Sequence, residues 1–299
     1  MLGIRWKTVR RCVIGMCLSL CCVSNSLAGV DICQQPTAYS QLSIAYYKDE
    51  KSTFESGIGE IGQENTSFDL LLHSKKNWAF GVGHRYTILN VDGLQLQTNG
   101  HLHTFFLSLH KQSQSDNKSF RFSVAPALSA SSNVMKDPGE YSGDAIQVLA
   151  ALVWGNTLSD RVTLRYGVCG DHRFGRYEIY PLISMDWQPH ADWTIELGFP
   201  TTRVVYKASR NITSSLRIAP DGNEWFVMDK TLQKQSQFVY EALLLEWAIN
   251  WQAHEHFRIS ASLGRNFDNR YEMTLLDDSQ VQLSSDPATR IGAAVAWRF

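Results

Sequence analysis

Apolar and polar residues alternate with a period of two along most of the chain after residue 40. In residues 77–89, Trp78 and Phe80 fall on one face of an extended chain, and Gly81 and Arg85 fall on the other. Because successive side chains of a strand point to opposite faces, this pattern predicts half-buried β-strands. Similar segments recur at residues 42–47, 67–73, 101–110, 120–125, 145–154, 162–168, 177–187, 193–199, 203–209, 238–251, 257–267 and 289–299.

The strand lengths and the spacers between strands favour a membrane barrel over a soluble β-sandwich. Most segments approach the roughly 9–11 residues that a tilted membrane strand needs, whereas sandwich strands average about 5–6. Short spacers follow His73, Trp154, Trp187 and Trp251, and long ones cover residues 90–100, 129–143, 219–235 and 268–287. Short turns at one end and long loops at the other are typical of outer-membrane barrels.

We therefore expect an all-β protein, a transmembrane antiparallel up-and-down β-barrel over residues 40–299. The strand number must be even if both chain ends lie on the same side of the membrane. We expect 12 strands, with 14 as the alternative, depending on how residues 193–209 divide. Pro200 lacks a backbone donor, so it marks either a bulge or a tight turn there.

Aromatic residues gather at one end of the predicted strands. When the strands are threaded up and down, the end with short turns collects Trp78, Phe120, Trp154, Trp187, Trp193, Trp251, Phe257 and Trp297. Indole combines an apolar body with a polar N–H group, which suits the membrane–water interface. A globular core has no reason to collect its tryptophans at one rim. We interpret these residues as a periplasmic aromatic girdle.

The C-terminal strand alternates up to an aromatic last residue. Its apolar positions are Ile291, Ala293, Val295, Trp297 and Phe299. This ending resembles the C-terminal signal of Gram-negative outer-membrane β-barrels, and the resemblance implies that the barrel-assembly machinery reads these residues. Residues 180–222, with Trp187-Gln188-Pro189 and Phe199-Pro200, also resemble a domain-of-unknown-function family of bacterial outer-membrane barrels. That family brings no known chemistry.

The N-terminus predicts export through a cleaved signal peptide, residues 1–28. Four basic residues precede an apolar run at 12–23, which is shorter than the roughly 20 residues of a membrane span, and Ser26-Leu27-Ala28 offers a cleavage site. With the four basic residues removed, 24 of the 28 remain against 29 acids, a net charge of −5. This balance argues against a nucleic-acid partner. We expect the protein in the outer membrane of a Gram-negative bacterium, among its lipids.

Two cysteines remain in the mature chain, Cys33 and Cys169. Exported thiols meet an oxidising compartment, where disulfides persist. One hypothesis is that residues 29–39 fold into the lumen as a plug pinned by a Cys33–Cys169 bond. The simpler alternative is a periplasmic tether with two unrelated cysteines.

Strand parity also predicts which charged side chains line the lumen. The cations are Arg85, Arg121, Arg165, Arg203, Lys207, Arg217, Arg258, Arg290 and Arg298, and the carboxylates are Glu178, Asp186, Glu196 and Glu246. Nine cations against four carboxylates indicate a basic-leaning channel for small solutes. The alternative is a structural barrel whose interior is held together by salt bridges. In that case Asp92, Asp144 or Asp221 of the loops would neutralise the excess positive charge of the lumen.

No pattern of catalytic residues emerges from the sequence. His101 and His103 share a strand face with Phe105 and point outward, and Asp171-His172 is expected in a solvated loop. Two histidines without further ligands at suitable spacing do not make a zinc site. We expect no enzyme activity, no metal and no cofactor. A barrel enzyme acting on lipid or peptide at the extracellular rim, or an adhesion or receptor barrel working through its loops, remains an alternative.

Overall fold

The computed structural model describes residues 32–34, 36–37, 39–74, 77–94, 100–136, 143–229, 234–274 and 279–299. The predicted signal peptide, residues 1–28, lies outside the described residues. The strands are β1 (Gln41–Thr53), β2 (Glu60–Ser74), β3 (Trp78–Asp92), β4 (His101–Ser115), β5 (Lys118–Ser131), β6 (Ile146–Ser159), β7 (Val162–Phe174), β8 (Arg176–His190), β9 (Trp193–Phe199), β10 (Thr202–Lys207), β11 (Ile212–Asp229), β12 (Lys234–His254), β13 (Phe257–Thr274), β14 (Gln280–Ser285) and β15 (Ala288–Arg298).

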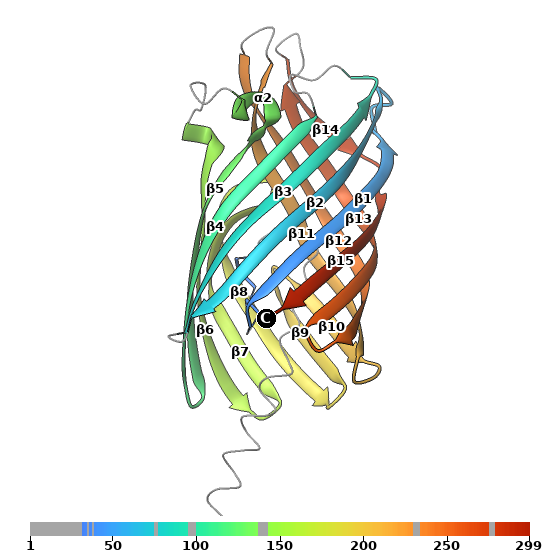
Figure 1. Cartoon of the computed structure of the whole chain (residues 1–299). Helices are drawn as coiled ribbons and strands as arrows, with labels where there is room; N and C mark the ends of the chain where they lie inside the picture. Colours follow the sequence, from blue (N-terminus) through green and yellow to red (C-terminus); the bar gives the residue numbers. More distant parts are fainter. Residues whose placement is uncertain are drawn as a thin grey trace, which may run out of the picture.

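The strands form one closed antiparallel barrel (Figure 1). Each strand pairs with its neighbours in the chain, and β1 pairs with β15 to close the cylinder. Both β14 and β15 pair with β13, so they are two parts of one interrupted strand. The barrel therefore has 14 strands, the alternative count, rather than 12. Its two ends are called the turn end, which holds Gln41 and Arg298, and the loop end.

Two segments explain the difference in strand number. Residues 193–209 divide into β9 and β10, with Pro200 in a tight turn between them. Residues 219–229, expected to belong to a long loop, continue β11 and pair with β12 up to Asp229. Pro220 is tolerated in this strand because it lies beyond the last β10–β11 pair, Thr202 with Ile218, where β11 needs no donor on that side.

The outer face of the barrel is apolar, as a membrane-spanning barrel requires. Exposed large apolar side chains include Phe80, Leu107, Ile183 and Trp247. Along each strand, the residues that alternate with such outward positions point inward and are more buried. Among the described residues, no helix is long and apolar enough to cross a membrane. The short helices α2 (Ser132–Met135) and η2 (Gly143–Ala145) follow β5 and precede β6 at the loop end.

The barrel wall differs between its two ends. Near the turn end all strands take part, but β9 and β10 have only 7 and 6 residues. Near the loop end, beyond the ends of β9 and β10, β11 lies next to β5 and forms a parallel bridge to it, Phe226 with Ala130. The loop-end part of the barrel is thus narrower than the turn-end part.

Candidate functional site

The predicted lumen residues lie on the inward face of their strands. Arg121, Arg217, Glu246, Arg258 and Arg290 are buried. Glu178 has the same parity as buried Tyr180 but is itself exposed, near the β7–β8 turn. The others are partly buried at inward positions: Arg85, Arg165, Asp186, Glu196, Arg203, Lys207 and Arg298.

The most buried ionic cluster of the lumen centres on Arg290. Its guanidinium binds Asp49 twice, with Nε–Oδ1 at 2.6 Å and Nη2–Oδ2 at 2.9 Å, and Asp221 once, with Nη1–Oδ2 at 2.8 Å. The same guanidinium lies 4.4 Å from the centre of the Tyr47 ring. Two-point binding fixes the planar guanidinium between strands that are far apart in sequence, β1, β11 and β15. The sequence placed Asp221 in a loop and missed Asp49, because β1 extends beyond residue 47.

A second set of ion pairs lies nearer the turn end. Arg165 contacts both Asp186 and Glu196, the latter at 3.1 Å. Arg203 lies 3.4 Å from Glu196. Arg217 lies 3.2 Å from Glu246. Three of the four predicted carboxylates, all but Glu178, therefore form ion pairs with predicted cations. This arrangement corresponds to the salt-bridged interior that was the alternative to a basic channel.

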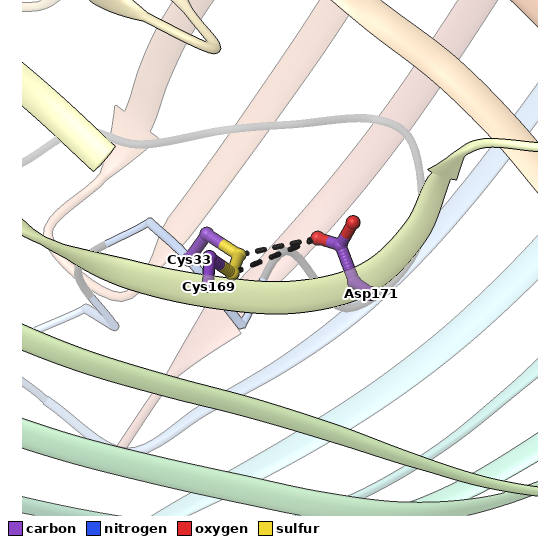
Figure 2. Close-up of side chains that lie close together, drawn as sticks. All are labelled: Cys33, Cys169 and Asp171. Carbon is purple, nitrogen blue, oxygen red and sulfur yellow. Dashed lines mark hydrogen bonds between the residues drawn. A yellow bond between two sulfur atoms is a disulfide. The ribbon is translucent and has the colours of Figure 1, made fainter. Parts of the chain in front are cut away.

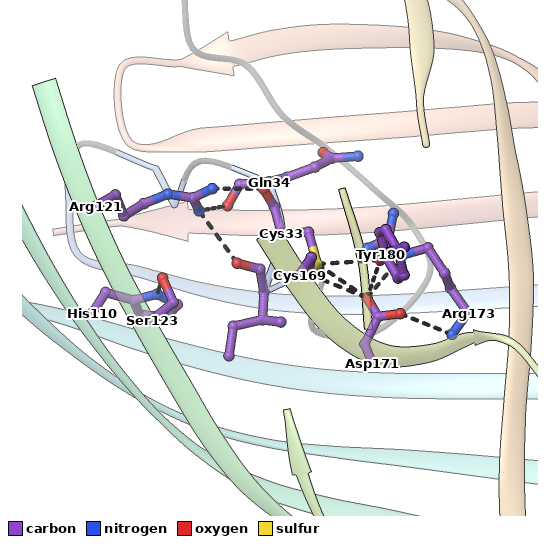
Figure 3. Close-up of a disulfide and its surroundings, with 10 residues drawn as sticks. Cys33, Gln34, His110, Arg121, Ser123, Cys169, Asp171, Arg173 and Tyr180 are labelled. Atoms are coloured by element: carbon purple, nitrogen blue, oxygen red, sulfur yellow. Dashed lines mark hydrogen bonds and ion pairs between the residues drawn. A yellow bond between two sulfur atoms is a disulfide. The ribbon is translucent and has the colours of Figure 1, made fainter. Parts of the chain in front are cut away.

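The remaining buried arginines hold the N-terminal segment inside the barrel. We call the described residues among 32–39 the lumen plug. Arg121 donates to the backbone carbonyls of Ile32 at 3.3 Å, Cys33 at 2.6 Å and Gln34 (Figure 3). Ile32 is completely buried among the inward side chains of β5, β6, β7 and β8. Arg121 thus binds three successive backbone carbonyls of the plug.

Tyr39 anchors the other end of the plug. Its hydroxyl accepts a hydrogen bond of 2.9 Å from Nη2 of Arg258, and its ring lies 4.0 Å from the guanidinium of Arg298. Both arginines stand at the turn end, on β13 and β15. The plug is therefore held by three arginines, at positions 121, 258 and 298, which strand parity had assigned to the lumen.

A disulfide joins the plug to the barrel wall. Cys33 bonds to Cys169 of β7, with the two Cα atoms 5.9 Å apart, within the usual range for a disulfide (Figure 2). This is the pinned plug of the sequence hypothesis rather than a tether with two unrelated cysteines. Figure 2 shows Asp171 pointing toward the same two sulfur atoms.

Asp171 is engaged on several sides. Its carboxylate accepts hydrogen bonds from the Tyr180 hydroxyl at 2.9 Å and from Nε of Arg173 at 2.8 Å. Cys33, Cys169 and Asp171 lie close enough to hold a metal ion. In the disulfide, however, the sulfurs are not thiolates, which are the form that binds metals. The expectation of a solvated loop at Asp171-His172 is wrong, because both residues belong to β7 and are buried.

Aromatic and aliphatic side chains pack against one another at the loop end of the barrel. We call this group the loop-end cluster; its buried members are Phe54, Ile61, Leu89, Leu102, Trp225, Val227, Phe238, Tyr240, Ala242, Tyr271 and Met273. The rings of Phe54, Phe238 and Tyr240 all lie within 6.3 Å of the Tyr271 ring, centre to centre. The sequence missed this cluster because its members alternate like all the other strand residues.

The predicted outward residues lie where parity placed them. His103 stacks on Tyr86 and shares a hydrogen bond of 3.1 Å with His84, on the outer face of β3 and β4. The girdle residues all occupy the turn end. Phe120 pairs with Trp154 across β5 and β6, and Phe257 pairs with Trp297 across β13 and β15. In the C-terminal segment, Ile291, Val295, Trp297 and Phe299 are exposed on the outer face.

The chain belongs to a protein family described as a domain of unknown function, DUF6268, whose model matches residues 37–281. This confirms the resemblance to an uncharacterised family. No curated protein matches the chain.

Several solved barrels are similar in structure. The NanC porin has 6% identity and a TM-score of 0.41, covering 86% of this chain and 100% of its own. An outer-membrane channel from Pseudomonas putida F1 has 9% identity and a TM-score of 0.47, covering 90% and 98%. A Pseudomonas aeruginosa FadL homologue has 10% identity and a TM-score of 0.48, covering 88% and 91%. At these values the transport activities of those proteins say nothing about this chain.

Proposed function

We propose that this protein is an outer-membrane channel for small solutes, closed in the conformation described above by its own N-terminal segment. The observation that carries the proposal is the lumen plug. A purely structural barrel needs only side chains of its strands to fill the lumen. Here a separate length of chain occupies the turn end, and a disulfide and three arginines hold it there.

The orientation follows from the aromatic girdle and the turns. Outer-membrane barrels have short periplasmic turns and longer extracellular loops, so the turn end faces the periplasm. The plug then enters the lumen from the periplasmic side, as expected for a segment that follows a cleaved signal peptide. On this proposal, outer-membrane lipids surround the apolar face, and the assembly machinery reads Trp297 and Phe299.

We further propose that the opened lumen prefers small anions. Arg165, Arg203, Arg217 and Arg290 are paired with carboxylates of the wall, so they add little net charge to the lumen. Arg121, Arg258 and Arg298 instead contact the plug. Removing the plug removes those contacts and leaves the three guanidinium groups facing the opened lumen, and rings of such residues favour anions. We propose no catalytic role and no cofactor.

Single-channel recording on a variant lacking residues 29–39 tests the proposal. We expect the oxidised wild-type protein to conduct little current and the deletion variant to conduct steadily. Its reversal potential in a salt gradient should indicate anion preference. The deletion variant carrying R121Q and R258Q is the matched control and should lose that preference. A deletion variant that is folded, as judged by heat-modifiable migration in detergent gels, and yet silent would contradict the channel.

A further inference from the structure

Two strands of the barrel wall lack a neighbour over part of their length. The pairing of β8 with β9 reaches only as far as Ile183 with Phe199, so residues 176–182 of β8 pair with β7 alone. The pairing of β10 with β11 ends at Thr202 with Ile218. We call the stretch between residues 176–182 and 219–222, beyond the β9–β10 turn, the wall break. In Figure 1 the hairpin of β9 and β10 is confined to the turn end.

The wall break lies within the hydrocarbon layer. Trp193 begins β9 at the girdle, and β9 has 7 residues. At about 3.3 Å per residue and a tilt of about 40°, this strand rises roughly 18 Å, less than the apolar band of about 25 Å around such barrels. The turn at Phe199 and Pro200 therefore ends inside the membrane. Unpaired backbone groups facing lipid cost several kcal/mol each, so a break at this height has to be sealed by specific contacts.

The edges of the break are adapted to the missing neighbours. Pro181, Pro200 and Pro220 lie on its three sides and carry no backbone donor. Just beyond the break, the Glu224 carbonyl of β11 accepts hydrogen bonds of 2.8 Å from the side chains of Ser129 and Gln147, on β5 and β6. These contacts indicate a break encoded by the sequence rather than a frayed hairpin.

Backbone contact closes the break on its loop-end side. A Cβ atom added to Gly222 of β11 would lie 2.6 Å from the backbone nitrogen of Gly175 and 2.8 Å from the carbonyl oxygen of Arg173. Only glycine at position 222 lets β11 approach the β7–β8 turn this closely, and Gly175 itself has a φ of 84°. The wall break is thus bounded on every side, with the Phe199 turn at its base.

Three aromatic rings lie at the base of the break. The Phe199 ring lies 5.9 Å from that of Phe174 and 5.9 Å from that of Tyr180, centre to centre. Phe199 is 48% exposed on the outer face, whereas Tyr180 is buried and its hydroxyl lies 3.3 Å from the sulfur of Cys33. Contact through these rings therefore leads from the outer face of the barrel to the disulfide that holds the plug. Next to it, Thr201 is only 6% exposed, and its hydroxyl has no hydrogen-bond partner among the described residues.

We propose that the wall break is a lateral port, closed by Phe199, through which a small apolar molecule moves between the membrane and the lumen. The inference rests on the proposed channel function and adds a second class of solute, apolar molecules that reach the lumen from the membrane rather than from water. The loop-end cluster lines the lumen on the extracellular side, and a route from the membrane avoids it. The aromatic lining fits a hydrocarbon ring or short alkyl chain. The buried Thr201 hydroxyl fits one polar group on that molecule, because a buried hydroxyl requires a partner.

Cysteine labelling tests the port without requiring conductance. In the T201C variant, reconstituted with the plug in place, N-phenylmaleimide dissolved in the membrane should react faster than a sulfonated maleimide confined to water. The F199A change should accelerate the N-phenylmaleimide reaction about tenfold, which corresponds to roughly 1.4 kcal/mol. F105A removes another exposed outward ring, on β4, and should leave the rate unchanged. Added toluene, a single apolar ring, should slow the reaction.

The outcomes that would contradict the lateral port differ from those that would contradict the channel. Equal rates for the two reagents, or no effect of F199A in a folded barrel, would overturn the lateral port. Failure of toluene to compete would overturn the assigned solute class. A silent plug-deletion variant contradicts the channel instead, and leaves the labelling result as evidence of access from the membrane.

Discussion

The two ends of the lumen are lined by different parts of the chain. At the loop end, the lining consists of strand side chains such as Phe238 and Tyr271, which belong to the wall itself. At the turn end, a separate segment of chain lies in the lumen, fixed through the Cys33–Cys169 disulfide and Arg121. The loop-end cluster cannot leave without dismantling the barrel, whereas the plug can leave once its few contacts are broken. The difference indicates that one end provides stability and the other provides control.

The largest effect should come from the ion cluster between the loop-end cluster and the plug. R290A leaves the buried carboxylates of Asp49 and Asp221 without their cation, so we expect the free energy of unfolding to fall by about 3–5 kcal/mol. Urea unfolding in detergent micelles measures it. R265A removes an exposed arginine of β13 and should change stability by no more than about 0.5 kcal/mol. Equal effects of the two variants would show that the cluster does not join the strands as described.

Truncation within the loop-end cluster should destabilise the barrel without opening it. F238A removes a ring that is 1% exposed, and large-to-small changes at such sites cost about 3–5 kcal/mol. Thermal unfolding followed by circular dichroism checks the stability, and bilayer recording should find no gain in current while the plug is in place. A conducting F238A barrel would mean that the loop-end cluster is the gate and would reverse the comparison.

Loss of the disulfide should have a smaller effect on stability and a larger one on the plug. C33S/C169S is expected to lower the free energy of unfolding by about 2–4 kcal/mol, because the bond closes a loop of 136 residues. Limited proteolysis from the turn end should then cleave within residues 29–39 while leaving the barrel intact. Protection of this segment in the double variant would show that the disulfide is not what retains it.

The smallest of these effects should come from Arg121. R121Q weakens the bonds to the carbonyls of Ile32, Cys33 and Gln34, and hydrogen bonds to charged groups contribute about 1.5–3 kcal/mol. Combined with C33S/C169S, it should accelerate cleavage of the plug further. With the disulfide intact it should change cleavage little. R210Q, at an exposed position in the turn before β11, is the control and should have no effect in either background.

Much of the architecture could be predicted because lipid-facing and lumen-facing residues alternate along every strand of a barrel, which gives the sequence a period of two. Alternation and the tryptophans at one end indicated a membrane barrel, and parity assigned Arg290 and Glu246 to the lumen. The division at Pro200 could not be decided, because a proline fits a bulge as well as a turn. Residues 219–229 carry Pro220 and Gly222, which commonly mark turns, so the loop predicted over residues 219–235 could not be distinguished from a continuation of β11 that pairs with β12.

The lumen site, with its plug and its ion pairs, could be predicted only in part from the sequence. Spacing allowed Cys33 to reach Cys169 but did not require it. The partners of Arg290 depend on the register of β1, β11 and β15, which one sequence does not fix. The wall break had a signal, the recurrence of proline at 181, 200 and 220, but its meaning depends on which strands are short. Only the pairing of the strands shows that these three prolines border the same wall break.

The most direct test of the removable plug is the current through one oxidised wild-type barrel in a planar bilayer, recorded before and after a thiol reductant is added on the turn-end side. The account predicts a low initial conductance and discrete openings after reduction. The C33S/C169S barrel should open without reductant and should not respond to it. A wild-type barrel that conducts equally before and after verified reduction of the disulfide would contradict the claim that the pinned N-terminal segment closes the lumen.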